Sequence, residues 1–196
     1  AAADIEFRFP FGFKELEGIH SRTDFYLVSH EKFTGKKLQY FDPERNENYV
    51  PYVVETSIGL DRMFLALLSN ALIEETLDDA TQRTVLKLPP ALAPTKVAVL
   101  PLVKKDGLPE LARTIVDDLK WDLETAYDEK DAVGRRYGRQ DALGTPYCIT
   151  VDHQSFEDQT VTYSERHSKQ QERIAMHHLN KSIVDIVYLP PLLQQL

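Results

Sequence analysis

The chain has 196 residues, of which 42% are hydrophobic and 28% charged, and its formal net charge is −8. This length suits one large domain or two small ones, and the absence of an apolar run of eighteen residues argues against insertion in a membrane. The acidic balance disfavours a protein that coats nucleic acid indiscriminately, although a local basic patch remains compatible with it. The single cysteine, Cys148, has no partner for an internal disulfide, so we expect a cytoplasmic protein.

The first half of the chain alternates between strand-like runs and one amphipathic segment. Residues 5–9, 37–41 and 49–55 are rich in β-branched and aromatic side chains, which is typical of strands. From residue 59 to residue 73 the apolar positions recur at helical spacing. We therefore expect a largely antiparallel sheet with one packed helix in a first domain, residues 1–93.

Three prolines between residues 89 and 94 mark the expected domain boundary, because proline removes backbone donors and disfavours helix and central strand. Beyond it we expect a buried strand, a helix, a second apolar strand and a terminal helix, at residues 96–100, 108–123, 146–151 and from Lys169 onward. This alternation predicts a small α/β domain with a mixed sheet over residues 94–196.

The segment from Glu55 to Arg62 combines two charges with the end of a strand and the start of a helix. Glu55 interrupts an apolar run, so it needs a cation: either a bound amino group or a neighbouring arginine or lysine, and spacing alone favours the neighbour. Arg62 stands on the first helical turn, where backbone donors and the helix dipole favour an anion. The alternative is that Arg62 pairs with a nearby acid.

The run Glu-Thr-Ser-Ile-Gly-Leu-Asp-Arg at residues 55–62 resembles motif 3 of class II aminoacyl-tRNA synthetases in its glycine-specific form. Residues 11–19 and 22–25 are similar to the segment that precedes this motif, with Lys14 where the family usually has glycine. The resemblance implies an antiparallel-sheet catalytic domain of that class. It also implies a glycine site and an ATP site: Glu55, Thr56, Ser57, Ile58 and Gly59 for glycine; Glu15, Leu16, Gly59, Leu60, Asp61 and Arg62 for ATP, with Arg62 catalytic.

The same resemblance implies a glycine–tRNA ligase that acts as a homodimer and takes ATP with Mg²⁺ as a substrate, with no tightly bound cofactor. We find neither the dimer-forming motif 1 nor motif 2, whose arginine holds the α-phosphate. The sequence begins with Ala1 and has no initiating methionine. We therefore expect a C-terminal piece of a longer enzyme, and we expect this piece to be inactive alone.

Residues 134–141 place three arginines and a tyrosine close together in an acidic protein, which suggests single-stranded RNA binding through Arg135, Arg136, Tyr137 and Arg139. An equally good interpretation from these residues alone is a solvated helix face whose arginines neutralise Glu129, Asp131 and Asp141. Residues 134–147 resemble the core of the anticodon-binding domain shared by glycyl, histidyl, prolyl and threonyl enzymes. The resemblance implies tRNA(Gly) as the partner.

Other polar groups suggest little chemistry. The histidines lack a spacing typical of zinc sites, so we expect no metal. The acidic cluster of Glu124, Asp128, Glu129 and Asp131 is most simply a solvated loop. A rival function is a nucleic-acid-binding accessory subunit that resembles a synthetase without ligase activity. Retention of Glu55, Ser57 and Arg62 together favours the enzyme.

Overall fold

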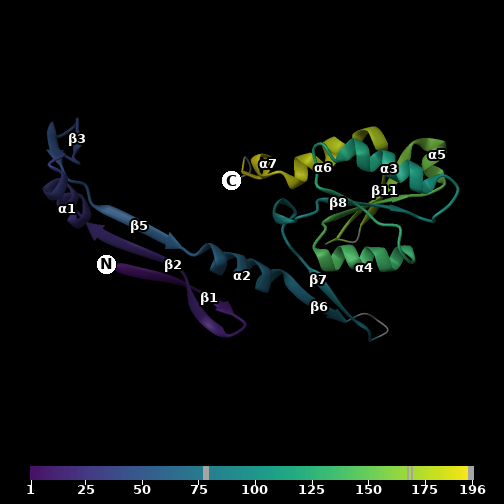
Figure 1. Ribbon diagram of the computed structural model, residues 1–196, viewed down its shortest axis with the longest axis horizontal. Coiled ribbons are helices and arrows are strands. Elements are labelled where there is room, and N and C mark those ends of the chain that lie inside the picture. Colours follow the sequence, from purple (N-terminus) through teal and green to yellow (C-terminus); the bar gives the residue numbers. More distant parts are fainter. Residues whose placement is uncertain (77–79, 167, 169, 194–196) are drawn as a thin grey trace. The chain divides into compact units, whose positions relative to one another are not determined.

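A computed structural model describes residues 1–76, 80–166, 168 and 170–193 of the chain (Figure 1). The chain divides into two compact units, Ala1–Ser69 and Asn70–Leu196, and each is described by itself. The sequence pattern assigned residues 70–93 to the first domain; the described part of this range, residues 70–76 and 80–93, belongs to the second unit.

The first unit is built on an antiparallel sheet of strand order β1-β2-β5, as predicted. A small hairpin and a helix lie between β2 and β5 in the sequence. The elements are β1 (Ala2–Phe9), β2 (Gly12–Thr23), α1 (Phe25–Thr34), β3 (Tyr40–Asp42), β4 (Glu47–Tyr49) and β5 (Val53–Ile58). Helix α1 was not predicted, because its apolar residues do not gather on one side and none of its residues is buried.

Helix α2 (Leu60–Ala71) follows β5 after Gly59, where the apolar spacing predicted a helix. It ends two residues earlier than expected, because Leu72 begins a new strand. The strands β6 (Leu72–Thr76) and β7 (Gln82–Leu86) form an antiparallel hairpin.

The second unit is a five-stranded mixed sheet of order β12-β11-β10-β8-β9, which confirms the predicted mixed α/β fold. Strand β8 pairs in parallel with β10 and β9, whereas β11 pairs antiparallel with β10 and β12. The strands are β8 (Val97–Pro101), β9 (Thr125–Tyr127), β10 (Tyr147–Val151), β11 (Thr160–Glu165) and β12 (Gln171–Ala175).

Helices cover both faces of this sheet. Helices α3 and α6 lie on one face and α4 on the other (Figure 1). The helical elements are η1 (Pro90–Leu92), α3 (Leu108–Leu119), α4 (Val133–Leu143), α5 (Gln154–Asp158), η2 (Met176–His178), α6 (Leu179–Val187) and α7 (Leu189–Leu193).

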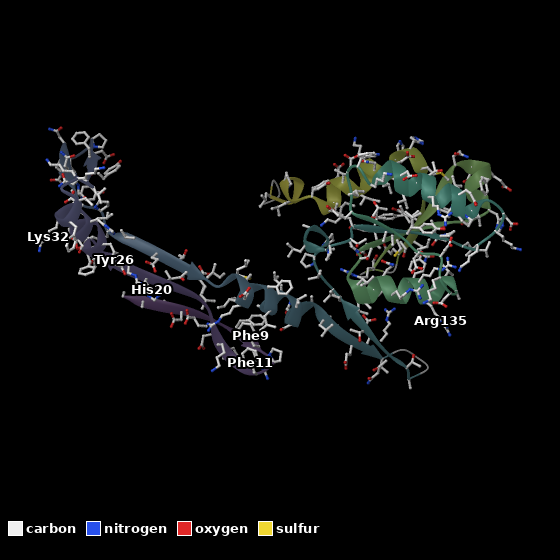
Figure 2. The ribbon with its side chains drawn as sticks, viewed as in Figure 1. Phe9, Phe11, His20, Tyr26, Lys32 and Arg135 are labelled. Carbon is white, nitrogen blue, oxygen red and sulfur yellow. The ribbon has the colours of Figure 1, made fainter. Side chains whose placement is uncertain are left out.

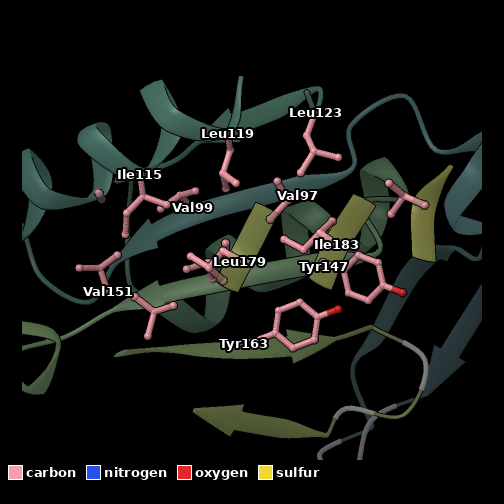
Figure 3. Packing of buried hydrophobic residues seen from close by; sticks show 14 of the residues in the cluster. Val97, Val99, Ile115, Leu119, Leu123, Tyr147, Val151, Tyr163, Leu179 and Ile183 are labelled. Atoms are coloured by element: carbon pink, nitrogen blue, oxygen red, sulfur yellow. The ribbon is translucent and has the colours of Figure 1, made fainter. Parts of the chain in front are cut away.

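Strand β8 explains this double cover, because all five of its residues are buried. Val97 and Val99 point into the core formed with α3 and α6 (Figure 3), while Ala98 and Leu100 pack on the α4 side with Cys148. A strand that is apolar on both faces must be covered on both faces.

The predicted terminal helix from Lys169 onward is wrong in its first part. Residue 169 lies outside the described residues, and residues 171–175 form the edge strand β12, which pairs with β11. The helix begins at Leu179. Single-sequence periodicity missed the strand because its residues are mostly polar and an edge strand needs little apolar surface.

The β6–β7 hairpin is fastened to α4 by a network of ion pairs. Arg83 donates to Glu75 at 2.6 Å and to Asp141 at 2.9 Å, and Lys87 lies 3.0 Å from the second oxygen of Glu75. At the end of α4, a Cβ added to Gly144 would lie 3.2 Å from the carbonyl oxygen of Leu86. Glycine therefore permits the close approach of the hairpin.

We predict that Glu75→Gln destabilises the second unit in a pH-dependent way. Hydrogen bonds from Arg83 and then Lys87 lower the pKa of Glu75 from 4.5 to about 2. A depressed pKa contributes stability that is present above the unfolded pKa and is lost as the pH falls through the folded value. The variant should be less stable by about 1–2 kcal/mol at pH 7, less than the full shift implies, because the carboxylate is partly solvated.

Urea unfolding of both proteins at several pH values measures this difference. It should shrink between pH 4.5 and pH 2, where the wild-type carboxylate becomes protonated. The exposed neighbour Glu74, changed to glutamine, serves as the matched control. A difference between wild type and Glu75→Gln that stays constant down to pH 2 would contradict the ion-pair explanation.

Candidate functional site

One face of the first unit's sheet gathers polar side chains from two neighbouring strands. Glu55 of β5 lies opposite His20 of β2, and Ser57 lies opposite Gly18. Directly opposed residues in a sheet share a face. The atoms nearest to a Cβ built on Gly18 belong to His20 and Glu15, so Glu15 lies on this face too. We call these five residues the polar face.

Glu55 pairs with Arg22, a residue near the end of β2. The Arg22 Nη2 lies 3.0 Å from Glu55 Oε1, and Arg22 Nε lies 3.3 Å from Oε2. These hydrogen bonds lower the pKa of the Glu55 carboxyl. The ring of Tyr26 lies 5.8 Å from the Arg22 guanidinium (Figure 2 labels Tyr26). The sequence allowed Glu55 either a bound amino group or a neighbouring arginine or lysine as its cation. The structure shows a neighbouring arginine, Arg22.

Both members of this pair remain accessible to solvent, with side chains exposed by 34% for Arg22 and 40% for Glu55. A pair at this exposure is held weakly, since water competes for both charges. The sheet edge therefore presents a cation and an anion side by side, each able to exchange its partner for a ligand group. Sequence reasoning did not single out Arg22, because nothing in the sequence indicates that it faces Glu55 across 33 positions.

Arg62 stands on the first turn of α2, as predicted, and reaches back to the sheet. Its Nη1 donates to the backbone oxygen of Glu15 at 2.6 Å. The residue also lines a cavity of about 250 Å³ with Phe9, Phe11, Lys14 and Leu65. The rings of Phe9 and Phe11 stack 5.2 Å apart (Figure 2).

The other residues predicted for glycine and ATP divide between the two faces of the sheet. Thr56 and Ile58 alternate with Glu55 and Ser57, so their side chains point to the opposite face. Only their backbone can take part in a site on the polar face. The remaining predicted residues occupy the strand-to-helix turn or β2: Leu16, Gly59, Leu60 and Asp61.

In the second unit, α4 carries the arginines predicted to bind RNA, and Arg136 is not available for that role. Its side chain is 2% exposed. The guanidinium donates to the backbone oxygens of Pro101, Lys130 and Asp131. Since this guanidinium is buried and each of its three nitrogens donates to a backbone carbonyl, we interpret Arg136 as structural rather than as an RNA contact.

Arg139 is also engaged by the protein. It donates to Asp128 at 2.8 Å and to Asp131 at 2.9 Å. Asp131 is exposed, as the solvated-loop prediction expects, whereas that prediction is wrong for Asp128, whose side chain is 15% exposed. Glu129 likewise accepts a hydrogen bond from Tyr127. The loop between β9 and α4 is ordered by ion pairs that the sequence analysis had named only as an alternative.

Tyr137 and Arg135 differ in their exposure. The Tyr137 hydroxyl lies 2.7 Å from Thr150 Oγ1, its ring packs against the β8 and β10 side of the sheet, and burial raises its pKa. Arg135 is exposed (Figure 2), and within the described part of the chain its side chain has no ion pair or hydrogen bond. Among the described residues, Arg135 is therefore the predicted RNA contact that is both exposed and without an ion pair, whereas Arg139 is 37% exposed and paired.

A cavity of about 210 Å³ lies beside α4. Its walls come from α4, from β10 and β11 and from the β6–β7 hairpin; the lining residues are Arg83, Tyr137, Asp141, Pro146, Cys148, Ser164, Glu165, Arg166 and Gln171. The Arg166 side chain, 8% exposed, donates to the backbone oxygen of Leu88 at 2.6 Å. Sequence reasoning missed Arg83 and Arg166, because each is an isolated arginine with a partner far along the chain: Asp141 for Arg83 and Leu88 for Arg166.

The described residues do not bring three or more histidine, cysteine, aspartate or glutamate side chains together as metal ligands would be. Among the helices formed by those residues, none has the length and apolar character needed to cross a membrane.

Comparison with known proteins places this geometry in a family. Residues 96–186 match the family described as anticodon binding domain. The chain is 52% identical over 175 residues to the glycine–tRNA ligase of Chlorobaculum tepidum and 50% identical over 181 residues to that of Borrelia hermsii. Over most of its length this chain is therefore similar to glycine–tRNA ligases, and residues 96–186 carry the anticodon binding domain. The matches cover 89% and 91% of the chain, so the resemblance of residues 55–62 to the glycine-specific motif is part of a similarity over nearly its whole length.

The chain spans about two fifths of these relatives, 37% of the first and 41% of the second. A solved structure of the RNA binding domain of threonyl-tRNA synthetase from Cryptosporidium parvum superposes with a TM-score of 0.69 at 18% identity, over 95% of this chain and 42% of that one. At this identity the likeness shows the fold alone, and it agrees with the mixed α/β architecture.

We predict that alanine at two adjacent arginines, Arg136 and Arg135, has very different effects on stability. Arg136→Ala leaves buried carbonyls without donors and should destabilise the second unit by at least about 2 kcal/mol. Arg135→Ala removes an exposed side chain and should change stability by no more than about 0.5 kcal/mol. Urea unfolding followed by circular dichroism measures both. Equal stability of the two variants would contradict a structural role for Arg136.

Proposed function

We propose that this chain is the part of a glycine–tRNA ligase that holds glycine on the polar face and the tRNA anticodon on the α4 side of the second unit. The observation that carries the proposal is the Arg22–Glu55 pair, at 3.0 Å, in a chain half identical to glycine–tRNA ligases. Its two charges match the carboxylate and the ammonium of a free amino acid.

Glycine binding requires the two charges to be held while a side chain is excluded. The Glu55 carboxylate accepts the ammonium, with Ser57 beside it on the same strand face, and Arg22 faces the carboxylate. The guanidinium suits a carboxylate, because it offers two parallel donors. Exposure of both side chains allows the protein's own pair to open for the ligand.

ATP with Mg²⁺ is the proposed second substrate. Arg62 and the Glu15 backbone form the neighbouring wall, where Arg62 carries positive charge at a helix N-terminus. In the proposed reaction a glycine carboxylate oxygen bonds to the α-phosphorus as the bond to pyrophosphate breaks. A ribose hydroxyl of tRNA(Gly) then attacks the glycyl carbonyl and AMP leaves. The protein acts mainly by positioning and by stabilising charge.

Anticodon binding is proposed for the side of the mixed sheet that α4 covers. Arg135 supplies an exposed cation for the RNA backbone, and the cavity of about 210 Å³ beside α4 is suited in size to a single planar group such as a base. Arg136 and Arg139 hold the helix and its preceding loop in place, so that Arg135 faces outward. We further propose a homodimeric, cytoplasmic enzyme, in which residues outside this chain complete the adenylate site.

We predict that the chain binds a tRNA(Gly) anticodon stem-loop and that Arg135→Ala weakens this binding by about five- to tenfold at moderate salt. Loss of one phosphate contact should also lower the slope of log affinity against log salt by about 1. Fluorescence anisotropy with a labelled stem-loop measures both quantities.

The matched control is Lys181→Ala on α6, which removes an exposed positive charge from the other face of the sheet. It should leave binding unchanged. Equal binding of an unrelated stem-loop, or equal weakening by the two variants, would contradict the proposed anticodon face.

A separate test concerns the ligase reaction. Glycine-dependent pyrophosphate exchange should be absent from the 196-residue chain alone and present in the full-length protein that carries it. In that protein Glu55→Gln should reduce exchange on the order of 100-fold or more, because the ammonium loses its charged partner. Pyrophosphate exchange by the 196-residue chain alone would contradict the proposal that residues outside this chain complete the adenylate site. Full activity of Glu55→Gln would contradict the proposal that Glu55 binds the ammonium.

A further inference from the structure

His20 stands at the centre of the polar face, on the strand β2 (Figure 2). Across the sheet it is paired with Glu55, while the preceding residue on the same face, Gly18, is paired with Ser57. His20 therefore lies directly beside both residues that face the amino group in the proposed glycine site. The resemblance to the family assigned no role to this position.

The imidazole leans over Gly18. A Cβ built on Gly18 would lie 2.8 Å from His20 Nε2 and 3.5 Å from Glu15 Oε1. Since real Cβ atoms do not approach other heavy atoms that closely, the ring occupies the space immediately above the Gly18 backbone. Gly18 is buried and His20 is half-buried, so the ring packs against the sheet rather than extending into solvent.

The spacing of residues in a sheet determines the distance between a bound amino acid and the His20 ring. Opposed residues on one face have Cβ atoms about 4.5–5.5 Å apart, and residues two positions apart on a strand are separated by roughly 7 Å. An amino acid whose ammonium contacts Glu55 and Ser57 thus places its Cα within a few ångströms of the His20 ring. The space between this Cα and the ring accommodates the hydrogen of glycine more easily than the methyl group of alanine.

We propose that His20 determines specificity by filling the volume that the side chain of any amino acid larger than glycine would require. This inference rests on the proposed glycine site and adds a steric wall to its two charged anchors. Electrostatic anchors alone cannot separate glycine from alanine, because both carry the same ammonium and carboxylate. Discrimination must come from a side chain that stands where a methyl group would go.

The test compares amino-acid-dependent pyrophosphate exchange with glycine and with L-alanine in the full-length protein that carries this chain. The quantity measured is kcat/KM for glycine divided by kcat/KM for alanine. His20→Ala should lower this ratio by at least about tenfold, through improved use of alanine, since one methyl group in a tight pocket is worth roughly 10–200-fold. His30→Ala on α1, an exposed histidine of the same unit, should leave the ratio unchanged.

The ratio separates a specificity wall from a merely structural histidine, because a structural defect lowers activity with both amino acids and leaves their ratio unchanged. An unchanged ratio in an active His20→Ala protein overturns the proposal. If that variant does not fold, His20→Asn, which keeps a smaller polar side chain, must lower the ratio by a lesser amount, and an unchanged ratio there overturns it. If the wild-type full-length protein shows no glycine-dependent pyrophosphate exchange, the proposed ligase function itself is wrong.

Discussion

The second unit depends on the burial of one guanidinium. Arg136 is 2% exposed, and it must find acceptors because an unpaired buried charge is strongly destabilising. It finds them in the carbonyl of Pro101, at the end of β8, and in two carbonyls of the loop before α4. These bonds fix the helix against the sheet. The adjacent Arg135 is thereby turned to solvent, so the exposed cation of the proposed RNA-binding surface follows from a packing requirement.

Arg22 on the first unit is held in the opposite way. It pairs with one carboxylate, Glu55, and both side chains are more than one third exposed to water. A buried guanidinium that is bound to carbonyls cannot exchange its partners, whereas a solvated ion pair can open when a ligand offers a carboxylate and an ammonium in its place. The two arginines show how the same residue type serves structure in one unit and fits ligand binding in the other.

The parts that the sequence predicted are those encoded by local patterns. Apolar spacing located α2, and an unbroken apolar run located the doubly covered strand β8. The parts that were missed depend on distant contacts or lack a pattern: α1 buries no residue, β12 is a polar edge strand, and Arg22 meets Glu55 only through strand pairing. Roles of arginines within one short segment likewise could not be separated before their burial was known.

Amide hydrogen exchange of the whole chain, with and without a tRNA(Gly) anticodon stem-loop, tests the proposed binding of RNA on the α4 side of the mixed sheet most directly. RNA bound on that side should slow exchange in α4 and in the strands that line the neighbouring cavity, β10 and β11, with no change in α3 and α6. Protection concentrated in α3 and α6, with α4 unchanged, would contradict it.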